Sequence, residues 1–132
     1  MALPLPKDFP TGFDRVFRLE VLEVSDTLAR GQVRVRDELK QAYGIVHGGV
    51  YAALAESLSS IATALAVAEE GKLAVGLSNQ TSFLRPITEG TVHGVAVRKH
   101  RGRTTWVWEV EMSDDDGRVC VLTRMTIAVR SV

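Results

Sequence analysis

Residues 44–60, GIVHGGVYAALAESLSS, open the longest apolar segment of the chain. From Val50 to Ala68 there is neither proline nor glycine, and almost every residue favours or tolerates a helix. Leucine and isoleucine recur at intervals of four, three and four residues, at Leu54, Leu58, Ile61 and Leu65. This spacing predicts one long helix with an apolar stripe, running to about residue 70 and closed by a left-handed Gly71.

Glu56 is the only acidic or basic side chain between His47 and Glu69. On a helical wheel it shares a face with small or hydroxyl-bearing residues, namely Ala52, Ala53, Ser59, Ser60 and Thr63. Such a narrow polar stripe suits a substrate groove or a helix contact between subunits. A glutamate on an apolar helix more often faces solvent or is satisfied by a polar neighbour, so Glu56 alone does not establish chemistry.

The start of the predicted helix is the second candidate feature. First-turn N–H groups have no partner within a helix and lie at the positive end of its dipole. Gly48 and Gly49 leave those donors open to a ligand oxygen. A histidine beside glycines, such as His47, is more often a loop or cap residue than a catalytic one. Glu56 is roughly 12 Å further along, so both groups reach one atom only if two antiparallel helices of two subunits contribute them.

Composition excludes several classes of protein. The 132 residues suit one domain, and 16 Lys and Arg balance 16 Asp and Glu, which argues against nucleic acid or an anionic membrane as partner. A lone Cys120 makes neither a disulfide framework nor a metal site. The first ten residues lack a basic segment and a long apolar one, so we expect no secretory signal, and no uninterrupted apolar run approaches about 18 residues. We therefore expect a cytoplasmic protein without a metal.

The remaining chain reads as antiparallel strands around the helix. Residues 1–12 form an irregular arm, with a short helical turn near 10–13. Alternation and turn signals predict six strands, at 16–24, 28–36, 73–84, 90–100, 103–112 and 118–129. Hairpin signals lie at 101–102 and 114–117. One helix cannot cover both faces of such a sheet, so we expect a curved sheet wrapped around it and completed by another subunit.

Several segments, taken in order, resemble the hotdog-fold acyl-CoA thioesterases. They are GIVHGGVYAALAES at 44–57, VGLSNQTSFLRP at 75–86, TTWVWEV at 104–110 and GRVC at 117–120. The resemblance runs from about residue 16 to the C-terminus and is closest to the branch typified by the Arthrobacter 4-hydroxybenzoyl-CoA thioesterase. It implies an α+β hotdog domain spanning 1–132, without an organic cofactor. It also implies a homo-oligomer, a dimer of dimers, with active sites at subunit interfaces.

The resemblance assigns catalytic roles to five residues. Glu56 attacks the thioester carbonyl or activates the water that does so. The backbone N–H of Gly48 polarises that carbonyl, and Gln41 assists it. His47 helps to position the substrate. Ser60 stands where the family pattern has threonine, and it keeps the hydroxyl that places water or substrate.

The resemblance also implies contacts to the CoA thioester. The acyl or pantetheine channel is lined by Asn79, Gln80 and Thr81. The nucleotide lies near cations at the strand ends, with contacts from Arg85, His100, Arg101, Arg103 and Thr104. Arg103 replaces a serine of the family pattern, and arginine can bind phosphate through two N–H groups.

The acyl group follows from the resemblance alone. It favours an aromatic acyl-CoA, with 4-hydroxybenzoyl-CoA as the best candidate, while phenylacetyl, dihydroxynaphthoyl and fatty acyl groups remain open. A dehydratase of the same fold is a weaker alternative, because no second acid stands beside His47. A non-catalytic acyl-CoA-binding module is an alternative of another class, in which Glu56 is only a satisfied polar residue.

Overall fold

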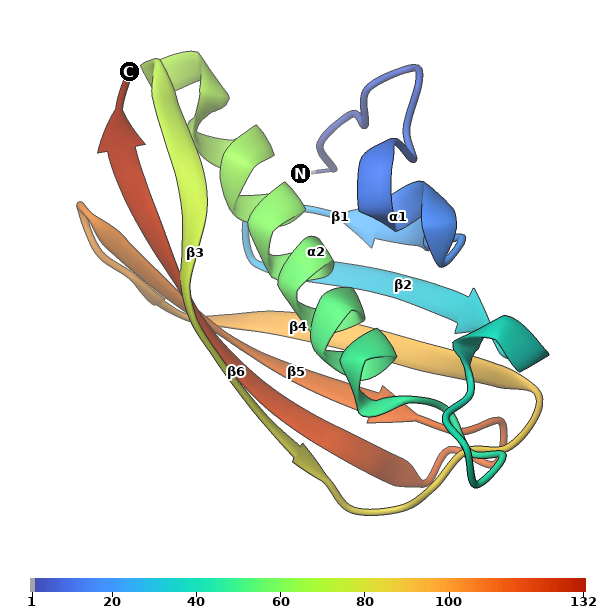
Figure 1. Cartoon of the computed structure of the whole chain (residues 1–132). Helices are drawn as coiled ribbons and strands as arrows, with labels where there is room; N and C mark the ends of the chain where they lie inside the picture. Colours follow the sequence, from blue (N-terminus) through green and yellow to red (C-terminus); the bar gives the residue numbers. More distant parts are fainter. Residues whose placement is uncertain (1) are drawn as a thin grey trace.

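A curved antiparallel sheet wraps around one long helix in the computed structural model, which describes residues 2–132 (Figure 1). The helices are α1 (Gly12–Val16) and α2 (Gly48–Val67), with short 3-10 helices η1 (Asp37–Leu39) and η2 (Ala68–Glu70). The strands are β1 (Glu20–Val24), β2 (Leu28–Arg34), β3 (Lys72–Phe83), β4 (Thr91–Arg101), β5 (Thr105–Ser113) and β6 (Val119–Ser131). Their order, β1-β2-β4-β5-β6-β3, confirms the predicted α+β hotdog architecture.

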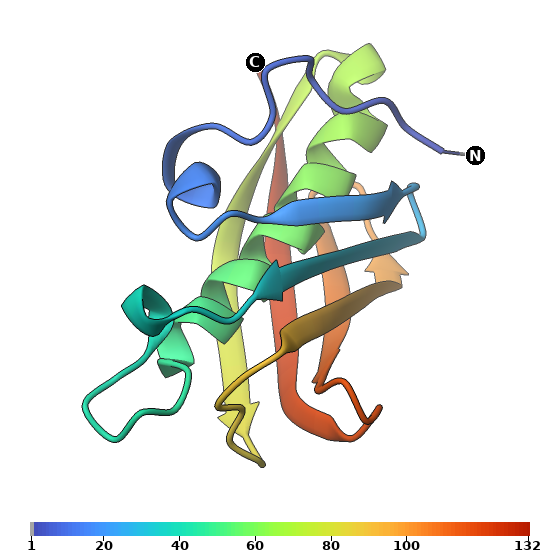
Figure 2. The same cartoon turned by 90° about the vertical axis from the view of Figure 1, so that its right-hand side faces the viewer.

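The helix α2 lies close against the concave face of the sheet, as the side view shows (Figure 2). Leu54 and Leu58 are almost fully buried there. Opposite them two glycines, Gly31 of β2 and Gly94 of β4, are register partners. A Cβ on Gly31 would lie 2.8 Å from a Leu58 methyl, and one on Gly94 would lie 3.2 Å from the side chains of both leucines. The absence of side chains at this pair therefore permits the close approach.

Two tryptophans of β5 fill the other half of the core. Trp106 and Trp108 are at most 1% exposed, and their ring centroids lie 6.4 Å apart. The indole Nε1 of Trp108 donates a hydrogen bond of 2.9 Å to the hydroxyl of Thr63 on α2. The face of β5 that carries the two tryptophans therefore points into the core.

Four predicted strand boundaries differ from the structure by two residues or more. The strand expected from 103 begins at Thr105, and the strand expected to end at 129 runs to Ser131. The strand expected from residue 16 begins only at Glu20, because Gly12–Val16 is helical and Arg18, at φ 58°, takes a left-handed conformation that ends this turn. Its apolar alternation arises instead from Phe17 and Leu19, which are buried in the connection. The strand expected to end at residue 36 ends at Arg34. The helical turn near residue 12, both hairpins and the left-handed Gly71 are confirmed.

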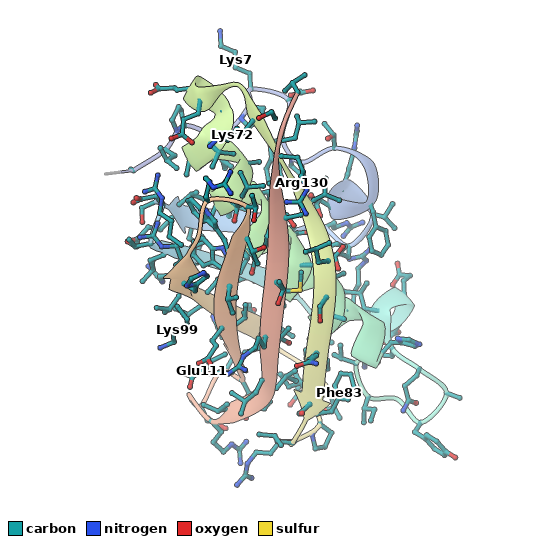
Figure 3. All side chains as sticks on the ribbon, turned by 90° about the vertical axis from the view of Figure 1, so that its left-hand side faces the viewer. Lys7, Lys72, Phe83, Lys99, Glu111 and Arg130 are labelled. Atoms are coloured by element: carbon teal, nitrogen blue, oxygen red, sulfur yellow. The ribbon has the colours of Figure 1, made fainter. Side chains whose placement is uncertain are left out.

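The two edges of the sheet differ. The N-terminal arm covers part of the β1 edge, where the Leu3 N–H donates to the Val24 carbonyl at 2.8 Å. The outer edge of β3 pairs with no strand among residues 2–132. This strand runs from Lys72 to Phe83 in Figure 3, and four of its apolar side chains are more than half exposed, Leu73, Val75, Leu77 and Phe83. A long, bare and apolar edge is the feature that a second chain normally covers.

The segment Gly48–Glu70 is long and apolar enough to span a membrane, with a mean hydropathy of 1.5. A search for uninterrupted apolar runs misses this segment, because polar residues such as Glu56 and Ser60 interrupt it. Half of the residues in its most apolar window are buried inside the fold. The apolar composition is that of a core helix held by a sheet.

Replacing Gly31 by alanine is expected to lower the free energy of unfolding by about 1–3 kcal/mol, because the new methyl overlaps Leu58. Leu58→Val alone costs about 1 kcal/mol. Combined, the two changes should cost less than the sum of the single losses, since the shortened side chain makes room for the methyl. Chemical denaturation of the three variants measures this coupling, and strictly additive losses would contradict the proposed contact.

Candidate active site

The first part of the site is the N-terminus of α2. His47 caps the helix, and its Nδ1 accepts a hydrogen bond of 2.8 Å from the Gly49 N–H, so a neutral ring carries its proton on Nε2. The N–H of Gly48 donates to no protein atom within residues 2–132. A Cβ on Gly48 would lie 2.8 Å from the ring of Phe83, so a side chain there would displace this ring, where the end of β3 meets the helix.

A cleft of about 460 Å³ opens beside this helix terminus. Its walls are mainly apolar and are formed by Gln41, Ile45, Val46, Gly48, Tyr51, Phe83, Leu84, Arg85 and Pro86. The structure thus brings Gln41 and Arg85 together with Gly48. The Gln41 side-chain oxygen accepts a hydrogen bond from the Tyr43 backbone N–H, which orients the amide in its loop.

Tyr51 and Phe83 line the same cleft, although the sequence reasoning did not select them. Their ring centroids lie 6.1 Å apart. Burial raises the pKa of Tyr51 to about 12, so its hydroxyl stays protonated at neutral pH. Tyr51 follows Gly48 by about one helical turn, and Phe83 belongs to the motif at 75–86. Both residues could therefore have been selected from the sequence.

The second part of the site is the carboxylate of Glu56. The residue is exposed on α2 and faces the middle of β3, where its Cδ is 3.8 Å from the place that a Gly76 Cβ would occupy. Asn79 Nδ2 lies 3.5 Å from one carboxylate oxygen and donates a firmer bond of 2.9 Å to the Ala52 carbonyl. The Thr81 hydroxyl in turn donates to Asn79 Oδ1 at 2.7 Å. Asn79 and Thr81 therefore belong to the surroundings of Glu56.

The predicted polar stripe along α2 is not one surface. Ser59 and Thr63 are fully buried against the sheet, and the Thr63 hydroxyl donates to the Ser59 carbonyl at 2.8 Å while accepting from Trp108. Only Glu56 is exposed, with Ser60 half-buried one turn later. The wheel grouped these residues correctly but gave no information on where the sheet lies. The stripe is therefore not an open groove, and the role of Ser60 stays a prediction.

Gln80 is not brought together with Glu56. Successive residues of a strand point to opposite faces, and Asn79 and Thr81 point toward α2. Gln80 instead lines a shallow hollow that also includes Glu109 and Arg124, which form an ion pair at 2.9 Å. The structure thus separates Gln80 from the other two residues of the predicted acyl channel.

The predicted nucleotide contacts also separate into two groups. Arg101 and Arg103 line a small hollow beside Val67 and Glu70, at the C-terminal end of α2. His100 lies near the end of β4, and Thr104 lies in the turn that follows and lines an adjoining hollow. Arg85 lies with Gly48 at the opposite end of the helix. Within one subunit, then, Arg85 does not share a site with the other four residues.

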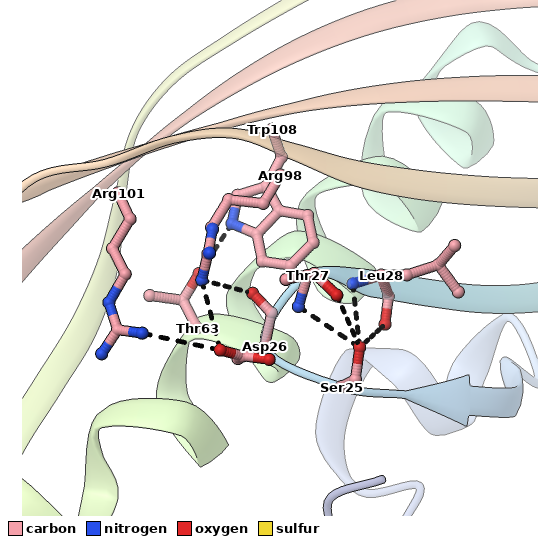
Figure 4. A network of polar contacts seen from close by, with 8 residues as sticks. All are labelled: Ser25, Asp26, Thr27, Leu28, Thr63, Arg98, Arg101 and Trp108. Atoms are coloured by element: carbon pink, nitrogen blue, oxygen red, sulfur yellow. Dashed lines mark hydrogen bonds and ion pairs between the residues drawn. The ribbon is translucent and has the colours of Figure 1, made fainter. Parts of the chain in front are cut away.

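A polar network fixes Arg101 in place (Figure 4). The Asp26 carboxylate lies 3.5 Å from a guanidinium nitrogen of Arg98 and 3.5 Å from one of Arg101. Both guanidinium groups also lie over the Trp106 ring, at 5.0 and 4.9 Å from its centroid. Sequence reasoning read Asp26 only as a turn residue, because nothing local indicates that this turn meets the hairpin after β4.

Other catalytic groups are less suitable. Cys120 is fully buried, and burial raises the pKa of its thiol, so it does not supply a thiolate nucleophile. Within residues 2–132 no three His, Cys, Asp or Glu side chains gather as a metal site would require. The groups that stay as candidates are the exposed carboxylate of Glu56, the open N-terminus of α2 and the apolar cleft beside it.

Comparison with known proteins gives a consistent assignment. The family described as "Thioesterase superfamily" matches residues 43–121. A protein of Mycobacterium tuberculosis named as an esterase is 42% identical over 118 residues, which cover 88% of this chain and 84% of the relative. Its solved structure superimposes with a TM-score of 0.87 at 38% identity, covering 91% of this chain and 97% of that one.

Two further relatives carry more specific names. The 1,4-dihydroxy-2-naphthoyl-CoA hydrolase of Escherichia coli K12 is 36% identical over 106 residues, 80% of this chain and 77% of its own. A thioesterase of Staphylococcus aureus is 26% identical, covers 91% of this chain and 99% of its own, and has a TM-score of 0.87. That protein was solved with alanine replacing a glutamine and, separately, with alanine replacing a glutamate.

Proposed function

The chain belongs to the thioesterase superfamily and is a thioester hydrolase; from this premise we propose that it hydrolyses an aromatic acyl-CoA. Our first candidate is 4-hydroxybenzoyl-CoA, in keeping with the resemblance to the Arthrobacter-type branch. Glu56 is the proposed nucleophile or general base, and the Gly48 N–H is the group that polarises the thioester carbonyl. The position of Glu56 is the observation that carries this proposal.

Glu56 has the surroundings that a catalytic carboxylate needs. It is exposed on an otherwise apolar helix, and the neighbouring Gly76 places no side chain over it. Asn79 lies at the edge of hydrogen-bond distance and is itself fixed by the Ala52 carbonyl. A carboxylate that is merely satisfied in a core would be buried and fully paired. Glu56 is neither. Its place against β3, beside Gly76 and Asn79, also distinguishes it from a glutamate that only faces solvent, and this favours the enzyme over the non-catalytic binding module.

The spacing of Gln41 and Glu56 also supports these roles. The two residues are separated by fifteen positions in this chain. The glutamine and the glutamate replaced by alanine in the S. aureus thioesterase are separated by the same fifteen positions. Gln41 lies in the cleft beside Gly48, where its amide can assist in orienting a carbonyl oxygen.

Two reaction routes fit this arrangement. As a nucleophile, Glu56 adds to the thioester carbon, the C–S bond breaks, and CoA leaves as the thiolate and takes up a proton. Water then hydrolyses the mixed anhydride and regenerates the carboxylate. As a general base, Glu56 removes a proton from water, and the resulting hydroxide displaces CoA directly. In both routes the Gly48 N–H stabilises the negative oxygen of the tetrahedral intermediate.

We propose that each active site combines two subunits. Along α2 the Gly48 N–H and Glu56 are roughly 12 Å apart, too far for one thioester carbon. The bare edge of β3 offers antiparallel pairing with a second copy. A two-fold axis near Asn79 would pair Phe83 of one subunit with Gly76 of the other. Phe83 lies against Gly48, and Gly76 lies beside Glu56. The partner subunit's Gly48 would then approach Glu56.

The proposed cross-subunit arrangement also explains the separation of the cations. Antiparallel pairing places the C-terminal end of one α2 near the N-terminal end of the other. Arg101 and Arg103 of one subunit would then lie on the same side of the dimer as the cleft that contains the other subunit's Arg85. A CoA molecule, with its reactive thioester and charged nucleotide far apart, suits such an extended site. The tetrameric state is a further expectation of the resemblance.

The cleft supports an aromatic acyl group. It has about 460 Å³, mainly apolar walls and two aromatic side chains, Tyr51 and Phe83. A second candidate substrate is 1,4-dihydroxy-2-naphthoyl-CoA, because the E. coli relative is named for its hydrolysis. Phenylacetyl and fatty acyl thioesters are the remaining candidates.

A panel of these acyl-CoAs, assayed with a thiol reagent, tests the proposed substrate and mechanism together. We expect aromatic acyl-CoAs to give the highest kcat/KM. Glu56→Gln keeps the shape of the side chain and should lower kcat by about 10²–10⁴-fold. Ser57→Ala, one position along the helix, serves as a folded control. Equal rates for wild type and Glu56→Gln would refute the mechanism, and a preference for fatty acyl groups would refute the aromatic substrate.

Replacing Arg103 by alanine tests the nucleotide contact. KM for the acyl-CoA should rise about tenfold with little change in kcat, as expected for loss of one charged hydrogen bond that binds ground and transition states alike. The matching acyl-pantetheine lacks the nucleotide, so its kinetics should be unchanged by Arg103→Ala. An equal effect on both substrates would show that Arg103 acts on folding or on the acyl end.

A further inference from the structure

Three arginines converge at the end of the sheet where β1 begins and β2 ends. Arg18, Arg34 and Arg36 line a hollow of about 270 Å³, with Glu20 as the only acidic residue in its lining. The hollow shares no residue with the cleft at Gly48 or with the hollows beside Arg103. It is therefore a separate feature that the thioesterase site does not use.

The positive charge of this hollow is poorly compensated. Within residues 2–132, no carboxylate oxygen lies within ion-pair distance of Arg18 or Arg34. The Glu20 carboxylate accepts a weak hydrogen bond of 3.4 Å from Gln32 instead. Three like charges around one hollow repel each other, although solvent screens the exposed Arg18 and Arg34, and a bound anion would relieve this repulsion.

Arg36 shows the same deficit in its hydrogen bonds. Its Nη2 donates a 2.6 Å bond to the Val16 carbonyl, the C-terminal end of α1. Its Nε and Nη1 are buried and lack a hydrogen-bond partner among the described residues. Glu38, which is mostly exposed, forms a long ion pair of 3.8 Å with Nε, beyond hydrogen-bond distance. Buried donors without a partner are unfavourable, and an anion in the hollow would satisfy them if the guanidinium turned toward it.

The backbone beneath Arg18 is also unusual. Arg18 has φ 58°, in the left-handed region, at the residue that follows α1. Two hydrogen bonds close this turn, from Arg18 N–H to Arg15 and from Leu19 N–H to Asp14. Glycine is the residue usually favoured at such a position, and a side chain there costs about 1 kcal/mol. An arginine at this strained position is consistent with selection for its side chain in the hollow.

We propose that this hollow binds a phosphate-class anion, a phosphate or diphosphate group. The guanidinium fork matches two oxygens of a phosphate, and a dianion compensates the cluster better than a single carboxylate does. The volume exceeds that of one phosphate and admits a diphosphate. The site lies at the start of the segment that leads through η1 to Gln41, but its existence does not depend on the proposed thioesterase mechanism.

Isothermal titration of the full-length protein with inorganic diphosphate tests the site. Wild type should bind, and Arg34→Gln should weaken the affinity about tenfold because it removes a charged hydrogen-bond donor. Arg30→Gln is the matched control, since it removes the same charge from the same strand at a residue that pairs with Glu23. The affinity of Arg30→Gln for diphosphate should stay within about twofold of the wild-type affinity if the hollow binds the anion.

Competition distinguishes the source of the phosphate. Adenosine 3′,5′-bisphosphate is the probe for a nucleotide, and displacement of diphosphate by it would identify a nucleotide ligand rather than a free phosphate compound. The site is refuted if wild type shows no binding, or if Arg34→Gln binds as tightly as wild type. It is equally refuted if Arg30→Gln loses as much affinity as Arg34→Gln, because the effect would then be one of net charge. Loss of binding in Arg103→Ala but not in Arg34→Gln would place the anion in the other cationic region.

Discussion

The close contact between α2 and the sheet is the constraint on which the other features depend. Gly31 and Gly94 leave a gap in the concave face that Leu54 and Leu58 fill. This contact and the bond between Trp108 and Thr63 fix both the distance and the rotation of the helix. The rotation directs Glu56 toward β3 and away from the core. The chemistry of the site is therefore a consequence of how the helix is packed.

The same packing leaves the site incomplete in one chain. The helix terminus at Gly48 and the carboxylate of Glu56 lie along one rigid rod, at a separation that no side-chain rotation closes. The bare edge of β3 lies beside both groups. An interface along this edge would bury the exposed apolar residues and also bring two complementary half-sites together. Stability of the assembly and catalysis would then have the same structural origin.

Much of this fold could be predicted from the sequence, because its strongest signals are local. The spacing of Leu54 and Leu58 predicted the core helix, and the turn at 114–117 predicted its hairpin. Features that depend on distant contacts were not accessible. A helical wheel placed Ser59 with Glu56 without showing that the sheet buries Ser59. Asp26 lies in a turn whose partner, Arg101, is far away in the sequence. The neighbours in the candidate site followed mainly from the family motifs, whereas the separation of Arg85 from Arg101 and Arg103 at opposite ends of α2 required the structure.

The shared active site is the central claim, and mixing two inactive variants tests it most directly. Gln41→Ala and Glu56→Ala should each be nearly inactive alone. After joint unfolding and refolding at equal amounts, about half of the dimers are mixed, and each mixed dimer contains one site with neither lesion, so activity should recover to about a quarter of wild type. If Gln41 and Glu56 of one chain serve the same site, every site keeps one lesion. The mixture would then show only the averaged residual activity, and the account would be contradicted.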